Sequence, residues 1–138
     1  MKIRIRKLEI DSYGYDPPHT EFFISNNQFS ATADEYIDES FWLNFGNALQ
    51  SFPKNLKDEV VFQKIGIPET YNPIQLRAFV YDGSGHCALE VKVIRQSSAP
   101  YSGFAHFFIL CEAATLNRLG NSLEMWVNSG EWEFIFVK

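Results

Sequence analysis

An alternation of apolar and polar residues between Ile74 and Cys111 constrains the fold of this chain more than any other feature. Successive side chains of a β-strand point to opposite faces, so this period of two indicates strands with one buried face. Asp82-Gly83 favours a type I′ hairpin turn after the first strand, and a second reversal falls within residues 96–103. The segment therefore predicts a three-stranded antiparallel meander.

The stretch from Asp34 to Pro53 has the pattern of an amphipathic helix with an acidic entrance. Asp38 is the expected N-cap, because its carboxylate accepts from backbone N–H groups of the first turn. Trp42 lies at the margin of the apolar stripe and is expected to cover the edge of a sheet. Gly46 weakens the helix by roughly 1 kcal/mol relative to alanine, so packing has to hold it. The stripe itself comprises Phe41, Phe45, Ala48, Leu49 and Phe52.

Five further strands and a second helix are expected outside these segments. The strand from Lys2 to Ile10 has a bulge or bend at Arg6-Lys7, and its Lys- and Arg-rich face suits an edge strand. Asn26-Asn27 predicts a hairpin turn. A helix begins near Thr115, its candidate N-cap, and ends at Ser129-Gly130. The other strands are expected over residues 21–25, 29–36, 60–65 and 132–136, with loops over 11–19 and 66–73.

These elements predict a single α+β domain spanning residues 1–138. A β-hairpin, a helix, a three-stranded meander, a second helix and a final strand place about six to eight strands in an antiparallel sheet. Two helices are expected to pack on one face of that sheet. The aromatic content of 16% suits such a core, since flat side chains pack well on a pleated surface.

Charge is distributed unevenly along the chain. The formal net charge of −5 argues against a nucleic-acid or anionic-membrane binder, because both require a basic face. Between Leu8 and Pro53 no Lys or Arg occurs. This asymmetry predicts one acidic surface, which is either a docking face for a basic protein or a solubilising face. The eight acids of this segment are Glu9, Asp11, Asp16, Glu21, Asp34, Glu35, Asp38 and Glu39.

Two thiols, an imidazole and a carboxylate are the candidates for a nucleophilic site. If the strands on either side of Ala99 pair, Cys87 lies opposite Cys111 and His86 lies opposite Glu112. Adjacent residues of a strand alternate faces, however, so the thiols and the His/Glu pair are expected on opposite sides of the sheet. Buried cysteine in a strand usually behaves as a small apolar residue. We therefore expect no catalytic residues and no enzyme.

No metal or cofactor site is expected. The chain has no Cys-x-x-Cys and no His pair at i, i+4, and its acids do not have calcium-loop spacing. Gly83-Ser84-Gly85 precedes a strand rather than a helix N-terminus, so it does not suit a phosphate. The first residues lack the apolar core of a signal peptide, and no apolar run reaches the roughly 20 residues that cross a bilayer. A cytoplasmic protein with reduced thiols is the expectation.

Strand pairs lead to a short Trp-bearing helix (Phe41-Trp42-Leu43 to Phe52), a long strand meander follows, and a leucine-spaced helix (Leu116 to Val127) lies near the C-terminus. This layout resembles the small α+β immunity proteins of bacterial polymorphic-toxin and contact-dependent inhibition systems, particularly the WapI-like kind. The final strand, Glu131 to Val137, departs from the pattern of that family.

The resemblance implies a non-catalytic cytoplasmic inhibitor that blocks a cognate toxin domain, often a nuclease with a basic cleft. Its acids would meet the Lys and Arg side chains that hold nucleic-acid phosphates, which speeds association. Buried aromatic side chains would anchor the interface. The implied partner-binding residues are Asp34, Glu35, Tyr36, Asp38, Glu39 and Trp42.

Other classes of function remain open. The excess of phenylalanine also suits a small-ligand-binding module with an aromatic-lined pocket. A protein-interaction domain of unspecified role needs only a stable surface. An enzyme ranks third and requires Cys87 and His86 to converge in one cleft. The partner, the strand order and the oligomeric state are left open.

Overall fold

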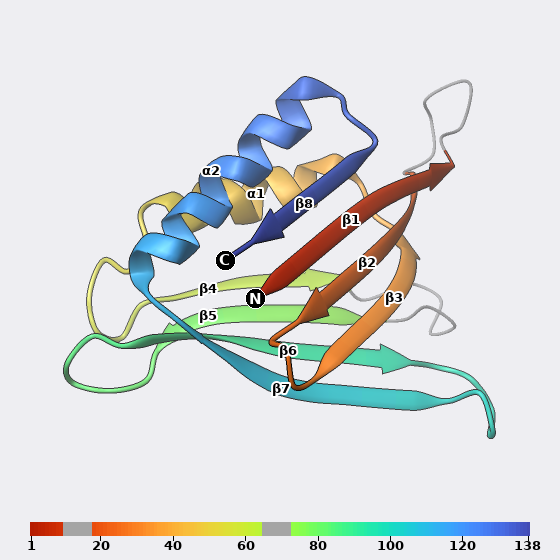
Figure 1. Ribbon diagram of the computed structural model, residues 1–138, viewed down its shortest axis with the longest axis horizontal. Coiled ribbons are helices and arrows are strands. Elements are labelled where there is room, and N and C mark those ends of the chain that lie inside the picture. The colour runs from red at the N-terminus through yellow and green to blue at the C-terminus, as the bar shows by residue number, and fades with distance from the viewer. Residues whose placement is uncertain (10–17, 65–72) are drawn as a thin grey trace.

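The computed structural model describes residues 1–9, 18–64 and 73–138 (Figure 1). Most of the expected loop over 66–73 and most of the loop over 11–19 lie outside the described residues. Eight antiparallel strands and two helices in the described part confirm the α+β class. In chain order the elements are β1 (Lys2–Glu9), β2 (His19–Ser25), β3 (Ser30–Tyr36), α1 (Glu39–Gln50), β4 (Glu59–Lys64), β5 (Ile74–Val80), β6 (Cys87–Arg95), β7 (Gly103–Cys111), α2 (Ala113–Ser129) and β8 (Glu133–Val137).

The strands form two four-stranded sheets instead of the single sheet expected. The first sheet has the order β3-β2-β1-β8 and the second has the order β4-β5-β6-β7. The division arises because β1 pairs with the last strand of the chain, whereas β4 to β7 pair only with their sequence neighbours. The inner faces of both sheets belong to one hydrophobic core. Figure 1 shows the helix pair between β8 and β4, where α1 contacts β4 and α2 contacts β8.

The expectation that the N-terminal strand is an edge strand is wrong, because β1 lies between β2 and β8. The two chain ends run antiparallel, and the backbone N–H of Lys138 donates to the carbonyl of Met1 at 3.0 Å. The irregularity of β1 lies between Lys7 and Glu9, close to the expected bulge. The outward-facing arginines of β1 therefore lie between β2 and β8, and do not protect an exposed sheet edge from pairing with another chain.

The two helices approach closely where a glycine of each meets the other. A Cβ atom added at Gly46 would lie 2.8 Å from the carbonyl oxygen of Gly120, and one added at Gly120 would lie 2.5 Å from that of Gly46. The glycine that weakens α1 therefore permits its contact with α2. Asp38 is confirmed as the N-cap of α1, accepting from the Ser40 N–H at 2.8 Å. Thr115 is not the N-cap of α2, which begins one turn earlier after Glu112.

Trp42 lies in the core rather than at its margin. Its side chain is 2% exposed and stacks on Phe62, with ring centroids 4.4 Å apart. Phe22 of the first sheet also stacks on Trp42, with ring centroids 5.8 Å apart. The indole therefore packs against aromatic side chains of both sheets. Phe41, which the apolar stripe placed inside, is 37% exposed. Phe45, Leu49 and Phe52 of the predicted stripe are buried as expected. Trp42 takes the place of Phe41 on the buried face, and Ala48 is exposed.

The three-stranded meander and its register are confirmed, with Cys87 directly opposite Cys111. The turn between β5 and β6 is not type I′, which requires positive φ at both central residues. The positive φ of 88° falls on Gly85. Asp82 fixes the turn by accepting from the backbone N–H groups of Ser84 and His86 at 3.0 and 3.1 Å.

Candidate functional site

The acidic block lies on β3 and the first turn of α1, but not all of it is surface. The strand alternates strictly between exposed and buried residues, so Asp34 and Tyr36 point outward while Glu35 points inward. Glu35 is buried, and its carboxylate accepts from the Tyr36 backbone N–H at 3.0 Å. Glu35 and Trp42 were both predicted to contact a partner. Their side chains are instead buried inside the domain.

Basic side chains from β1 compensate part of the acidic block. The ammonium of Lys7 is buried, bonds the Glu39 carboxylate and lies 5.2 Å from the centre of the Trp126 ring. Arg4 and Arg6 lie 3.5 and 3.3 Å from the Glu21 carboxylate. The sequence segment without Lys or Arg is thus adjacent in space to the most basic strand. Within residues 1–9, 18–64 and 73–138, the acidic surface is smaller than the charge pattern indicated.

Among the described residues, an aromatic pair flanked by carboxylates lies at the surface, and we call it the acidic edge (His19, Asp34, Tyr36, Asp38). Tyr36 is 45% exposed, and its ring stacks on His19 with centroids 5.0 Å apart. His19 Nε2 lies 3.8 Å from Asp34 Oδ1. A hollow of about 140 Å³ adjoins Asp34, with Glu21 and the basic Arg95 in its wall. His19 was expected in a loop, yet it begins β2 opposite Tyr36.

Comparison with known proteins does not indicate a function for the acidic edge. No protein family, curated protein or solved structure matches the chain. The interpretation of each surface therefore depends on its own geometry and chemistry.

The thiols were expected on the opposite side of the sheet from His86 and Glu112, but all four residues line one cleft of about 300 Å³ at the end of the second sheet. Burial raises the pKa of the Cys87 thiol, which donates to the Gly85 carbonyl, and raises the pKa of Cys111 to about 11. The His86 ring is held by Asp82, with Nδ1 to Oδ2 at 2.6 Å. Nucleophilic cysteines usually have a lowered pKa, whereas the pKa of both thiols in this cleft is raised.

Neither metal ligation nor a membrane span is indicated in the described part of the chain. No group of three or more His, Cys, Asp or Glu side chains among residues 1–9, 18–64 and 73–138 is arranged to hold a metal ion. Neither of the two helices there is long and apolar enough to cross a bilayer.

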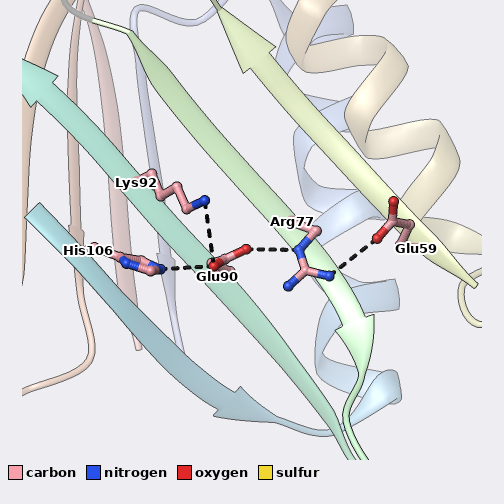
Figure 2. Close-up of polar contacts among 5 residues, drawn as sticks. All are labelled: Glu59, Arg77, Glu90, Lys92 and His106. Carbon is pink, nitrogen blue, oxygen red and sulfur yellow. Dashed lines mark hydrogen bonds and ion pairs between the residues drawn. The ribbon is translucent and has the colours of Figure 1, made fainter.

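A polar network that the sequence did not predict lies on the outer face of the second sheet (Figure 2). Glu90 is buried at its centre and accepts from Arg77 Nε, and it lies 2.8 Å from His106 Nε2. Arg77 also contacts Glu59 at 3.3 Å, and Lys92 lies 3.9 Å from Glu90. The register that pairs Cys87 with Cys111 also pairs Lys92 with His106. The predicted strand pairing therefore already placed Glu90, Lys92 and His106 close together on one face of the sheet.

The network changes the protonation of Glu90. Burial alone would raise the pKa of this carboxyl, but the hydrogen bonds from Arg77 and His106 outweigh it and lower the pKa below the ordinary 4.5. Glu90 in turn raises the pKa of Arg77. A carboxyl whose pKa is lower in the folded than in the unfolded state stabilises the fold above the unfolded pKa, and this contribution is lost as the pH falls through the folded pKa.

Glu90→Gln is expected to lower the free energy of unfolding by roughly 1–2 kcal/mol at pH 7, because charge-assisted hydrogen bonds become neutral ones. The difference in unfolding free energy from wild type should shrink as the pH falls from 4.5 towards the lower pKa of the folded carboxyl, because the unfolded chain takes up the proton first. Urea unfolding at several pH values measures it. Glu59→Gln is the control, since the exposed Glu59–Arg77 pair contributes little. If the difference in unfolding free energy between Glu90→Gln and wild type stayed constant down to pH 3, the lowered pKa of Glu90 would be contradicted.

Proposed function

We propose that this protein is a non-catalytic binding protein, an immunity-type inhibitor that blocks a cognate nuclease-like toxin domain through the acidic edge. The supporting observation is an exposed tyrosine, stacked on His19, with the exposed carboxylates Asp34 and Asp38 beside it. Aromatic side chains held rigid by a neighbour lose little entropy on binding, and carboxylates select a basic surface. The resemblance in layout to WapI-like immunity proteins supports the same class. As proposed, the inhibitor acts in the cytoplasm.

Inhibition would follow from occupation of the toxin's basic cleft. Lys and Arg side chains that hold nucleic-acid phosphates would instead meet Asp34 and Asp38, and Tyr36 would fill the space of a stacked base. Long-range attraction between opposite charges mainly accelerates association, whereas the desolvated aromatic contact mainly slows dissociation. The two kinds of residue should therefore have different kinetic signatures.

The double variant Asp34→Asn/Asp38→Asn is expected to associate with the toxin several-fold more slowly at low ionic strength. Its fold should persist, because asparagine caps a helix as well as aspartate does. The measurement is biosensor kinetics against the domain encoded by the adjacent gene, made catalytically inactive. Tyr36→Ala should instead raise the dissociation rate, by about tenfold.

Glu112→Gln is the control, because this exposed acid lies just before α2 and is not part of the acidic edge. It removes one charge from the same protein and should leave association within about twofold of wild type. An unchanged association rate in the double variant would show that Asp34 and Asp38 do not face the partner.

A small-ligand-binding module is the second candidate, because a groove of about 410 Å³ lies between α1 and β4. Phe41, Phe45 and Phe62 line it, with Asn44 and Gln63 as polar neighbours. Saturable binding of a small apolar compound, insensitive to salt and weakened by Phe41→Ala, would favour this function over inhibition.

A further inference from the structure

The outer face of the second sheet presents apolar side chains to solvent around the Glu90 network. The helices and the first sheet pack against its other face, where Leu76 and Leu89 belong to the core. On the outer face, Val61 of β4 and Phe108 of β7 are 43% and 44% exposed. Leu110 and Phe104 of β7 are exposed to an even greater degree. Aromatic and aliphatic side chains around an arginine are typical of interface centres.

One row of residues across this sheet is self-complementary. The register places Val61, Arg77, Glu90 and Phe108 directly opposite one another on β4, β5, β6 and β7. Read from β4 to β7, the row is apolar, positive, negative, apolar. Read in reverse, every charge meets its opposite and each apolar residue meets an apolar residue.

We propose that two copies of this chain associate through this face, about a two-fold axis that runs parallel to the strands between β5 and β6. That axis reverses the strand order of one copy relative to the other. Arg77 of each copy then lies across from the largely buried Glu90 of the other, and the exposed Val61 of each copy lies against the exposed Phe108 of the other. An axis perpendicular to the strands would place Arg77 against Arg77, which like-charge repulsion opposes.

The charge of the face permits such self-association although the chain carries −5. Glu59 and Glu90 contribute two negative charges, and Arg77 and Lys92 contribute two positive charges, so their sum is zero. Arg77 is also pre-positioned, because its guanidinium lies 4.1 Å from the centre of the Phe79 ring. Two neutral, mutually complementary faces meet without the repulsion that the rest of the surface would impose.

This interface is independent of the proposed inhibition. The acidic edge lies on β2, β3 and the start of α1, whereas the dimer face lies on the outer side of β4 to β7. A dimer could therefore carry two acidic edges, and failure of either proposal would leave the other standing.

The test uses two single variants of the full chain, Val61→Lys and Phe108→Glu, in sedimentation equilibrium. Wild type is expected to have twice the monomer mass at micromolar to millimolar concentration. Each variant alone should weaken dimerisation by about tenfold or more, because a charge then faces an apolar side chain. Mixed in equal amounts, the two should form a heterodimer close to wild type in affinity, since the new lysine faces the new glutamate and the other contact remains Val61 with Phe108.

Met125→Glu, on the exposed face of α2, is the control and should dimerise as wild type does. Circular dichroism checks that all variants keep their fold. A wild-type protein that stays monomeric at millimolar concentration overturns the proposal. So does a mixture that remains monomeric while each variant alone is weakened, because the face would then serve some other occupant.

Discussion

Gly120→Ala is expected to destabilise the protein by about 3 kcal/mol, although alanine is the better helix former. The added Cβ would lie 2.5 Å from the Gly46 carbonyl oxygen and 2.8 Å from Leu49 Cβ. The first of these neighbours is backbone of α1, which cannot rotate away, so the helices must separate. Their separation would loosen the packing around Leu49 and Leu123, which are both buried. Urea unfolding followed by circular dichroism measures the loss.

Two variants bracket this result. Asn47→Ala, on the exposed face of α1, should be neutral or slightly stabilising, since it changes propensity alone. Gly46→Ala should be destabilising too, because its Cβ would lie 2.8 Å from the Gly120 carbonyl oxygen. If Gly120→Ala were as stable as wild type, the close approach of the two helices would be wrong.

Trp42→Ala is expected to cost about 3–5 kcal/mol of unfolding free energy, the range observed when a large buried aromatic residue is truncated. The indole stacks between Phe22 and Phe62, so its removal leaves a cavity where the two sheets meet α1. Thermal and urea unfolding measure the effect, and in a domain of this size the loss is a large part of the total stability.

Phe41→Ala provides the matched comparison, as it removes an aromatic side chain from the adjacent, exposed position of the same helix. Its cost should remain below about 1 kcal/mol. A Trp42→Ala protein that is fully stable but fails to bind its partner would restore the tryptophan as an interface anchor and contradict its place in the core.

Local patterns in the sequence were sufficient for β5, β6 and β7 of the second sheet, but not for the pairing of β4 with β5. Alternation and the turn at Asp82 located β5, β6 and β7, and pairing around Ala99 predicted the register of Cys87 with Cys111. Asp38 was identified as an N-cap and Gly130 as a C-terminal glycine, which has φ 74°. All of these depend on residues near one another in the chain, where steric and hydrogen-bonding rules act directly.

The pairing of β1 with β8 could not be predicted, because it joins residues over 120 positions apart and leaves no local signature. Two errors followed from it: the single sheet and the placing of β1 at an edge. The extent of the acidic surface was overestimated for a related reason, since pairing of β1 with β2 brings Arg4 and Arg6 to Glu21. Charge counted along a sequence ignores neighbours across strands.

The apolar stripe of α1 was predicted to begin at Phe41 instead of Trp42 for a different reason. Phe41 and Trp42 are adjacent and both large, so a period of 3.6 does not determine which of them marks the centre of the stripe. The choice depends on Phe22 and Phe62, which come from different sheets and stack on the indole. The close contact between the two helices also depends on Gly46 and Gly120, which lie opposite each other. A hydropathy pattern does not reveal this pairing.

The salt dependence of association with the adjacent gene product tests the proposed inhibition most directly. Association of the purified protein with that toxin domain would be followed by stopped-flow fluorescence from low to high ionic strength. Steering by Asp34 and Asp38 predicts an association rate that falls steeply as salt rises, with a nearly constant dissociation rate. A toxin domain that does not bind, or that associates at a rate independent of salt, would contradict the proposal.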